Sequence, residues 1–292
     1  MKKEKVQSLI TVHFTKIVQK DRKIHNAYLL IHSEKLGIQL NIAEGSTGSR
    51  PANAQQPYFI ASIGKLFTSV LIGILVEKGM ISYEDTITQF LDNNLLHNLH
   101  IYQGKDYTDN IKVKHLLNHT SGLHDYFDDK PKQGKSMIDI IFDEPSRFWT
   151  PQETIQWSKE HLKSHFPPGK GFHYSDTGYH ILGLIIEQIT STPFHEALRH
   201  YIFQPLQMNH SYLAHYSESM VKSDYPVADL YSGNTNVTQY RSLSIDYAGG
   251  GIVATSEDLL KFMKALVKHE IIREDTFEKM KDWAKFSIGI DY

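Results

Sequence analysis

The sequence of 292 residues contains no cysteine. Disulfide bonds, thiolate metal ligands and a cysteine nucleophile are therefore excluded. It also has no uninterrupted apolar run of the ~18 residues that a membrane-spanning helix needs. Basic charge is not in excess either, because 31 lysines and arginines face 33 acidic residues, a formal net charge of −2. Without a basic stripe, nucleic acid is not an expected partner.

The N-terminal stretch MKKEKVQSLITVHFTKIVQK begins with positive charge, as a secretory signal does. Polar residues interrupt the apolar stretch that follows, and no small-x-small cleavage site comes after it. We therefore expect a cytoplasmic protein in which residues 1–23 form an N-terminal segment ahead of the main domain.

Hydrophobic periodicity predicts several elements. Alternation at 36–43 predicts a strand, with a hairpin turn at HSEK (32–35), and the composition of 45–57 predicts a loop. Apolar residues from Ile63 to Leu75 recur at helical spacing and predict a helix over 62–78. Gly79 is placed to end this helix, and the region from about 80 to 235 reads as mainly helical.

Two later segments also carry clear patterns. Residues 178–189, GYHILGLIIEQI, are apolar nearly all round and predict a buried helix. Residues 249–266 predict a strand followed by a helix that begins with a capping box of Thr255 and Asp258. The three glycines at 249–251 lack the lysine of a phosphate-binding loop and predict a tight turn. Alternation in FSIGIDY (286–292) predicts a further strand.

Ser62 and Lys65 form an S-x-x-K motif at the start of the first predicted helix. At this spacing both side chains lie on one helix face, about 5–6 Å apart at their Cβ atoms. A serine hydroxyl becomes a useful nucleophile only when a base accepts its proton. By itself the tetrapeptide favours a simpler interpretation, a helix-capping serine followed by a solvated lysine.

A second candidate group, Tyr174 and Asp176, lies between a Pro-Gly loop and the predicted buried helix. A tyrosine there can exchange a proton with Ser62 or with a leaving group. The alternative is an ordinary surface turn whose tyrosine packs on the domain.

Together, S-x-x-K and Y-x-[ND] about a hundred residues later resemble the motifs of the serine β-lactamase and penicillin-binding protein superfamily. The segments VKHLLNHTSGLHDY, PPGKGFHYSDTGYHILGLIIEQIT and AGGGIVATSEDLLKFMKAL look like those of one branch. That branch contains class C β-lactamases, D-alanyl-D-alanine carboxypeptidases and related esterases. The resemblance runs from about residue 26 to the end.

The resemblance implies an α+β fold in which an antiparallel sheet is flanked by helices and carries a large, mainly helical insertion. The sheet part would span about 24–61 and 240–292, and the helical part about 62–239. It implies that Ser62 attacks an acyl carbon, Lys65 assists as base and Tyr174 shuttles the proton. Asp176 takes the place usually held by asparagine. The backbone N–H of Ser62 would form half of an oxyanion hole, and no metal or organic cofactor is implied.

Two departures from the family pattern matter. A carboxylate at Asp176 facing Lys65 would favour the charged ammonium, so we expect Tyr174 to carry more of the base role. The family's third motif, K-T-G or H-x-G, is not found after Ser256. We therefore expect a C-terminally shortened member that lacks its last strands.

The remaining candidates are weaker. His115 and His119 stand at the i, i+4 spacing of a zinc site, but no glutamate follows the first histidine, so no metal is expected. The aromatic residues of the helical region could line a substrate cleft or belong to the core: Tyr126, Phe148, Trp149 and Trp157.

The expected function is acyl hydrolysis through an acyl-enzyme on Ser62. The substrate would be a small-molecule or peptidoglycan-like acyl compound, with an ester, a D-amino-acid amide or a β-lactam as the bond broken. Two alternatives remain open: a penicillin-binding or sensor-like protein that is acylated without turnover, and an inactive remnant. The sequence does not predict an oligomeric state.

Overall fold

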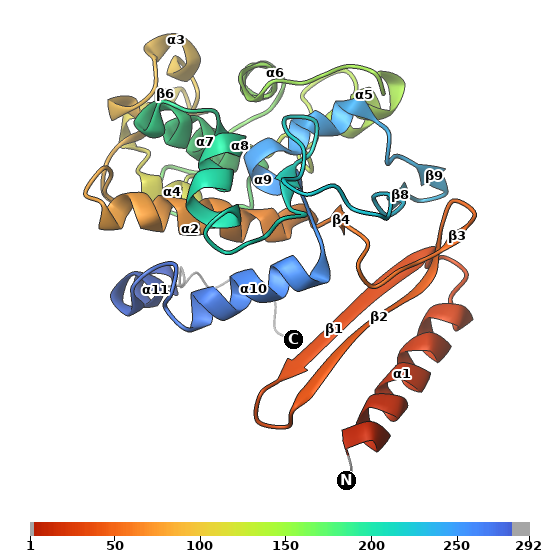
Figure 1. The fold of residues 1–292 in the computed structure, drawn as a ribbon. Helices are drawn as coiled ribbons and strands as arrows, with labels where there is room; N and C mark the ends of the chain where they lie inside the picture. Colours follow the sequence, from red (N-terminus) through yellow and green to blue (C-terminus); the bar gives the residue numbers. More distant parts are fainter. Residues whose placement is uncertain (1–2, 282–292) are drawn as a thin grey trace.

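The computed structural model describes residues 3–281. At the N-terminal end, helix α1 (Lys3–Lys20) packs against strand β2 (Ile38–Thr47) of an antiparallel hairpin with β1 (Asn26–Ser33). Figure 1 shows this helix and hairpin projecting below the helical part. The side chains of Thr15 and Gln19 on α1 both hydrogen-bond the Glu44 carboxylate on β2.

The hairpin differs in detail from the prediction. The turn lies at residues 34–37, two residues later than HSEK, because Ser33 pairs with Ile38 and Gly37 adopts a φ of +59°. Part of the predicted loop at 45–57 is strand: β2 continues to Thr47 and pairs with the short β3 (Arg50–Pro51). Glycine, serine and proline predict a turn by composition, but they do not prevent backbone pairing on either side of it.

A second small sheet connects distant parts of the chain. Its strands are β4 (Tyr58–Phe59), β10 (Ile252–Ala254) and β7 (Tyr212–Leu213), in the antiparallel order β4-β10-β7. The segment just before Ser62 is therefore held by residues almost 200 positions later, and β7 comes from within the mainly helical region.

The core is built on two buried helices, α2 (Gly64–Glu77) and α7 (Asp176–Thr190). Both were predicted from periodicity, and Gly79, at φ +68°, follows the end of α2 as expected. Ile63 was predicted on the buried face but is 53% exposed, since it lies in the 3₁₀ turn Ala61–Ile63 that precedes α2.

The other elements are short and mostly helical. They are η2 (Ile87–Gln89), α3 (Asn93–Leu96), β5 (Ile101–Tyr102), β6 (Lys105–Asp106), η3 (Thr108–Asn110), α4 (Val113–Leu117), α5 (Met137–Asp143), α6 (Pro151–His161), α8 (Phe194–Leu198), the π-helix η4 (Arg199–Phe203), β8 (Tyr231–Ser232), β9 (Thr235–Asn236), η5 (Arg241–Asp246), α9 (Tyr247–Gly250), α10 (Ser256–Val267) and α11 (Glu274–Met280). This mixture of helices and antiparallel strands is the predicted α+β class.

Three of the four aromatic residues weighed as cleft residues belong to a second, smaller core. Tyr126, Trp149 and Trp157 are buried together there. Phe148 is half-buried beside the Tyr216 ring. Of the two interpretations, cleft lining and core packing, core packing therefore holds for Tyr126, Trp149 and Trp157.

Helix α10 follows β10 as predicted, but its capping box is incomplete. Thr255 accepts the Asp258 N–H, whereas the Asp258 carboxylate accepts from the His210 N–H and the Ser211 hydroxyl. The predicted strand at 286–292 lies outside the described residues.

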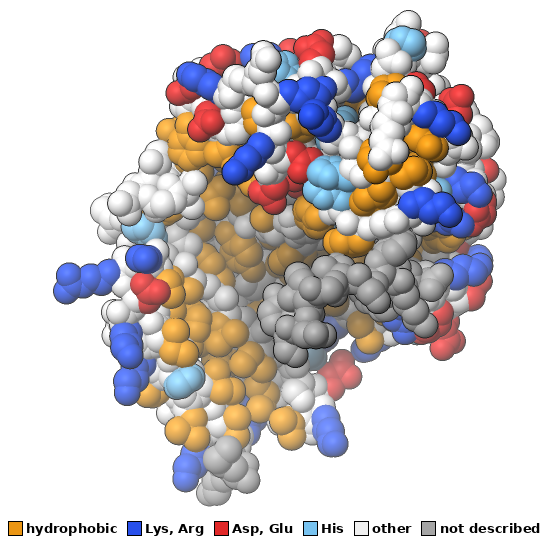
Figure 2. Space-filling model, turned by 180° about the vertical axis from the view of Figure 1, so that it is seen from behind, with side chains coloured by type: hydrophobic (Ala, Val, Ile, Leu, Met, Phe, Trp, Pro, Cys, Tyr) orange, Lys and Arg blue, Asp and Glu red, His pale blue; other side chains and the backbone are white. Residues whose placement is uncertain are grey.

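Viewed from behind, the end of the molecule formed by α1 and the β1–β2 hairpin displays many hydrophobic side chains (Figure 2). Leu9 and Val12 of α1 and Leu36 of the hairpin turn are each more than half exposed. Among residues 3–281, none of the helices is both long enough and apolar enough to cross a membrane.

Candidate active site

Ser62 is exposed in a strained turn between β4 and α2. Ala61, just before it, has a φ of +47°, a left-handed conformation that costs a non-glycine residue energy and is often found at functional sites. The Ile60 N–H donates to the Ile252 carbonyl at 3.0 Å, which continues the β4–β10 pairing up to the turn. The neighbouring sheet thus presents the serine hydroxyl to solvent.

Lys65 lies under the serine and is only 6% exposed. Its Nζ donates to Ser62 Oγ at 3.3 Å and to the Gly249 carbonyl at 2.8 Å. It also forms an ion pair with the Asp176 carboxylate, itself largely buried. A buried ammonium with a carboxylate and a carbonyl around it is stabilised in its charged form.

Tyr174 approaches Ser62 from the other side. Its hydroxyl donates to Ser62 Oγ at 2.9 Å, and Lys65 Nζ lies 4.8 Å from the centroid of its ring. The four residues singled out in the sequence are therefore brought together in one cluster, with the serine hydroxyl in contact with both a phenol and an ammonium.

His119 fixes the tyrosine, a task that the sequence did not reveal. Its ring stacks on the Tyr174 ring at a centroid distance of 4.3 Å, and its Nδ1 accepts the Ser175 N–H at 3.1 Å. Burial, with the nearby Lys65 charge, lowers the pKa of His119 to about 4. The ring is thus neutral near pH 7 and can accept that hydrogen bond.

His119 and His115 were considered together as possible zinc ligands. In the structure the His115 Nδ1 accepts the Lys112 N–H, so each imidazole holds a different backbone donor. In the sequence, the signal that pointed to His119 as a residue of the site was its position in the family-like segment 113–126.

Two further carboxylates surround Asp176, and neither was predicted. Asp125 Oδ1 accepts the Asp176 N–H at 2.8 Å; burial, and next the Asp176 charge, raise the pKa of Asp125 to about 6. Burial, and then the same charge, raise the pKa of Asp246 to about 7, although part of this side chain reaches solvent. With a pKa of about 7, Asp246 is only about half ionised at neutral pH, and Asp125, with a pKa of about 6, is protonated only below that pH, so the negative charge around Lys65 falls as the pH drops below neutral.

The glycines at 249–251 are needed for close approach and not for an unusual φ. They end α9 and lead into β10, against the start of α2. A Cβ on Gly249 would lie 2.7 Å from Asp176 Oδ1 and 3.5 Å from Lys65 Nζ. A Cβ on Gly250 would lie 3.2 Å from the Ala61 carbonyl carbon. A side chain at Gly249 would therefore displace the Asp176 carboxylate from Lys65, whereas one at Gly250 would crowd the backbone just before Ser62.

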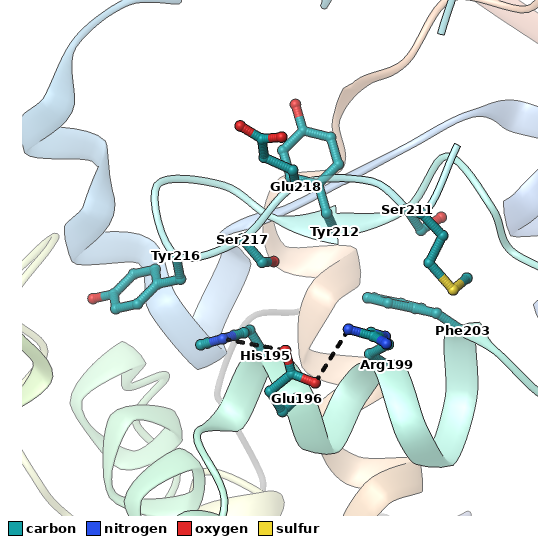
Figure 3. A pocket seen from close by; sticks show the side chains of 10 residues that line it. His195, Glu196, Arg199, Phe203, Ser211, Tyr212, Tyr216, Ser217 and Glu218 are labelled. Carbon is teal, nitrogen blue, oxygen red and sulfur yellow. Dashed lines mark hydrogen bonds and ion pairs between the residues drawn. The ribbon is translucent and has the colours of Figure 1, made fainter. Parts of the chain in front are cut away.

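A separate cavity of about 260 Å³ lies between α8–η4 and the segment that follows β7 (Figure 3). Its lining includes Glu196, which is paired with Arg199 at 3.5 Å and with His195 at 3.8 Å. None of the four clustered residues lines this cavity, so it is distinct from the serine site.

Chemically, the cluster supplies an exposed hydroxyl, a phenol that can exchange its proton, and a cation that can stabilise negative charge on either oxygen. These are the requirements for attack on an acyl carbon.

A family model described as Beta-lactamase matches residues 16–288, and the chain therefore belongs to the beta-lactamase family of serine hydrolases. Penicillin-binding protein 4* of Bacillus subtilis (strain 168) is 27% identical over 267 residues, which cover 84% of this chain and 53% of that protein. The chain spans about half the length of the first curated relatives that it matches.

Solved structures support the same fold. A D-stereospecific amidohydrolase from Streptomyces sp. superposes with a TM-score of 0.76 at 22% identity, covering 94% of this chain and 77% of that one. The D-amino acid amidase from Ochrobactrum anthropi SV3 gives a TM-score of 0.69 at 25% identity, covering 95% and 74%. The predicted β-lactamase/transpeptidase-like architecture is confirmed by these neighbours.

Proposed function

We propose that this protein is a serine acyl hydrolase in which Ser62 forms the acyl-enzyme. The observation that carries the proposal is the 2.9 Å hydrogen bond between Tyr174 and Ser62, with Lys65 Nζ 3.3 Å from the same oxygen. The exposure of Ser62 leaves its hydroxyl open to a substrate.

The reaction starts from the phenolate form of Tyr174, in which the 2.9 Å hydrogen bond runs from the Ser62 hydroxyl to the phenolate oxygen. In acylation, Ser62 Oγ bonds to the acyl carbon while its proton passes to that oxygen. Tyr174 delivers a proton to the leaving alcohol or amine as the bond to that group breaks. In deacylation, water adds to the acyl carbon, its proton passes to Tyr174, and Ser62 recovers a proton as the acid leaves. Tyr174 is a proton shuttle and ends each cycle as it began.

Lys65 acts in this proposal as a fixed cation. Its contacts with Asp176 and the Gly249 carbonyl hold it charged beneath the serine and beside the Tyr174 ring. A positive charge at that point stabilises the phenolate form of Tyr174 each time the proton leaves.

The substrate class follows from the relatives and from the surface beside the serine. Relatives named D-amino acid amidase and penicillin-binding protein support a D-amino-acid amide or a β-lactam as the bond broken. An ester is the third candidate, because the same acyl-enzyme chemistry cleaves it. Ile63 is 53% and Phe172 is 42% exposed, next in the chain to Ser62 and close to Tyr174. These side chains favour a substrate with an apolar group.

The intact mass of the protein after exposure to a fluorophosphonate, and separately to a penicillin, tests the nucleophile. We expect a single adduct on the native chain and none on Ser62→Ala. Ser69→Ala, on the helix α2 that follows Ser62 and hydrogen-bonded to the Tyr179 hydroxyl, is the matched control and keeps the adduct. Labelling of Ser62→Ala, or no labelling of folded native protein, would contradict the proposal.

Turnover is tested with a p-nitrophenyl butyrate, D-phenylalanine amide and a chromogenic cephalosporin. Steady release of product after any burst supports hydrolysis. A burst equal to the enzyme concentration with no further release would instead identify a protein that is acylated without turnover.

A further inference from the structure

Asp129, His165 and His173 meet at one point on the surface of the helical part. The Nε2 atom of His165 lies 2.8 Å from Asp129 Oδ2, and the Nε2 atom of His173 lies 3.2 Å from both carboxylate oxygens. One ligand atom from each of the three residues lies within 4.8 Å of the others. In the part of the chain that the structure describes, no other group of three or more such residues converges in this way.

The three side chains come from two loops that backbone hydrogen bonds hold together. The His165 N–H donates to the Gly122 carbonyl and the His173 N–H donates to the His119 carbonyl, both at 2.9 Å. The two imidazole rings stack at a centroid distance of 3.5 Å, so their Nε2 atoms face the same carboxylate. The geometry of the group is therefore set by the fold.

The carboxylate is oriented from behind. Asp129 Oδ2 accepts the Asp125 N–H at 2.8 Å, an orienting hydrogen bond of the kind that supports metal-bound carboxylates. The Asp129 side chain is 18% exposed and those of His165 and His173 are 35% and 26% exposed. Water and a dissolved ion can therefore reach the group.

We propose that Asp129, His165 and His173 form a binding site for a divalent transition-metal cation of the Zn²⁺ type, separate from the serine site. Two imidazoles and one carboxylate suit zinc and its neighbours, whereas magnesium and calcium prefer oxygen ligands throughout. Water supplies the fourth ligand from the open side.

Binding needs only small changes. In each imidazole the single proton moves from Nε2 to Nδ1. The Nε2 lone pair is then free to bind the ion, and no proton has to be released. The ligand atoms then settle at about 2.0–2.1 Å from the ion. The ion would tie the loop that carries Asp129 to the loop that ends at Tyr174, the residue after His173.

Calorimetric titration of the chelator-treated full chain with zinc chloride tests the site. We expect one bound ion per chain, with affinity at least about tenfold weaker in His165→Gln and in Asp129→Asn. The matched control is His195→Gln: His195 also lies beside a carboxylate, Glu196 at 3.8 Å, but without a third ligand. This variant keeps the native affinity.

Hydrogen exchange gives a second readout that does not depend on activity. Zinc should slow exchange at residues 120–130 and 165–175 in the native chain and leave His165→Gln unchanged. The inference is overturned if zinc does not bind the native chain. It is also overturned if zinc binding and protection from exchange persist in both His165→Gln and Asp129→Asn. Magnesium chloride in place of zinc should produce no binding.

Discussion

The Tyr174 hydroxyl donates a 2.9 Å hydrogen bond to the Ser62 hydroxyl across 112 positions of sequence. Of the two groups that touch the serine oxygen, the phenol is the closer, and the ammonium is engaged by the Asp176 carboxylate and the Gly249 carbonyl. The shortest route for the serine proton therefore leads through Tyr174.

Tyr174→Phe tests this route. We expect it to lower the rate of acylation by a fluorophosphonate about 10²- to 10⁴-fold, the usual contribution of a general acid–base group, without lowering the melting temperature. Tyr58→Phe removes a different phenolic hydroxyl, one bonded to Ser256, and serves as the control with near-native rate. A Tyr174→Phe rate within a factor of three of native would show that Lys65 alone suffices.

Asp176→Asn tests the charge on Lys65. Asparagine keeps the size of the side chain but removes the negative charge that is paired with the Lys65 ammonium beside Ser62. We therefore expect the labelling rate of this variant to depend on pH differently from that of the native chain. The rate–pH profile is measured from the labelling rate between about pH 5.5 and 9.5, with the exposed Asp109→Asn as control. An unchanged profile would remove Asp176 from the mechanism.

Gly249→Ala tests the close packing over the ion pair. The new Cβ would lie 2.7 Å from Asp176 Oδ1, so the carboxylate must move away from Lys65. We expect destabilisation by about 1–3 kcal/mol and at least a tenfold loss of labelling rate. Gly79→Ala, at φ +68° with open space around it, should cost about 1 kcal/mol with the labelling rate unchanged. Equal labelling by the two variants would contradict the expectation.

Asp246→Asn tests the raised pKa of Asp246. This pKa is about 7 in the folded chain, against about 3.9 for an unfolded aspartate. Between these values the folded state holds a proton that the unfolded state lacks, so stability falls as pH rises from about 4 to about 7 and is then level.

The asparagine variant has no titrating group at position 246, so it should lose less stability between about pH 4 and pH 7. Relative to the native chain it should gain on the order of 2 kcal/mol between about pH 4.5 and 8, a conservative figure since part of the side chain reaches water. Urea unfolding at the two pH values measures this difference, again beside Asp109→Asn. Parallel loss of stability in both proteins would show that Asp246 titrates normally.

The sequence predicted best where one local pattern decides the structure. The apolar spacing of residues 62–78 and 178–189 is enough to specify α2 and α7, because a helix that buries one face or most of its surface shows it in periodicity. The turn of the first hairpin was misplaced by two residues, since register depends on the partner strand and not on turn composition alone.

The site was only partly predictable for the same reason. Ser62, Lys65, Tyr174 and Asp176 belong to motifs that a sequence displays, and the structure brings them into one cluster. Asp246 belongs to no motif, and Asp125 lies in the family-like segment 113–126, where nothing singles it out; only the folded chain brings their charges close to Asp176. His119 was visible as a histidine, but its stacking on Tyr174 depends on a left-handed backbone at φ +59° that no spacing rule predicts.

The pairing of β4 with β10 has a consequence for synthesis of the chain. Residues 58–59 present the serine, yet their partner strand is residues 252–254, and the carbonyl that holds Lys65 belongs to Gly249. During synthesis on the ribosome, Ser62 emerges early. The site around it cannot assemble until most of the chain has emerged. Nascent chains should therefore be inert toward acylating compounds, and reactivity should arise late, as a single event.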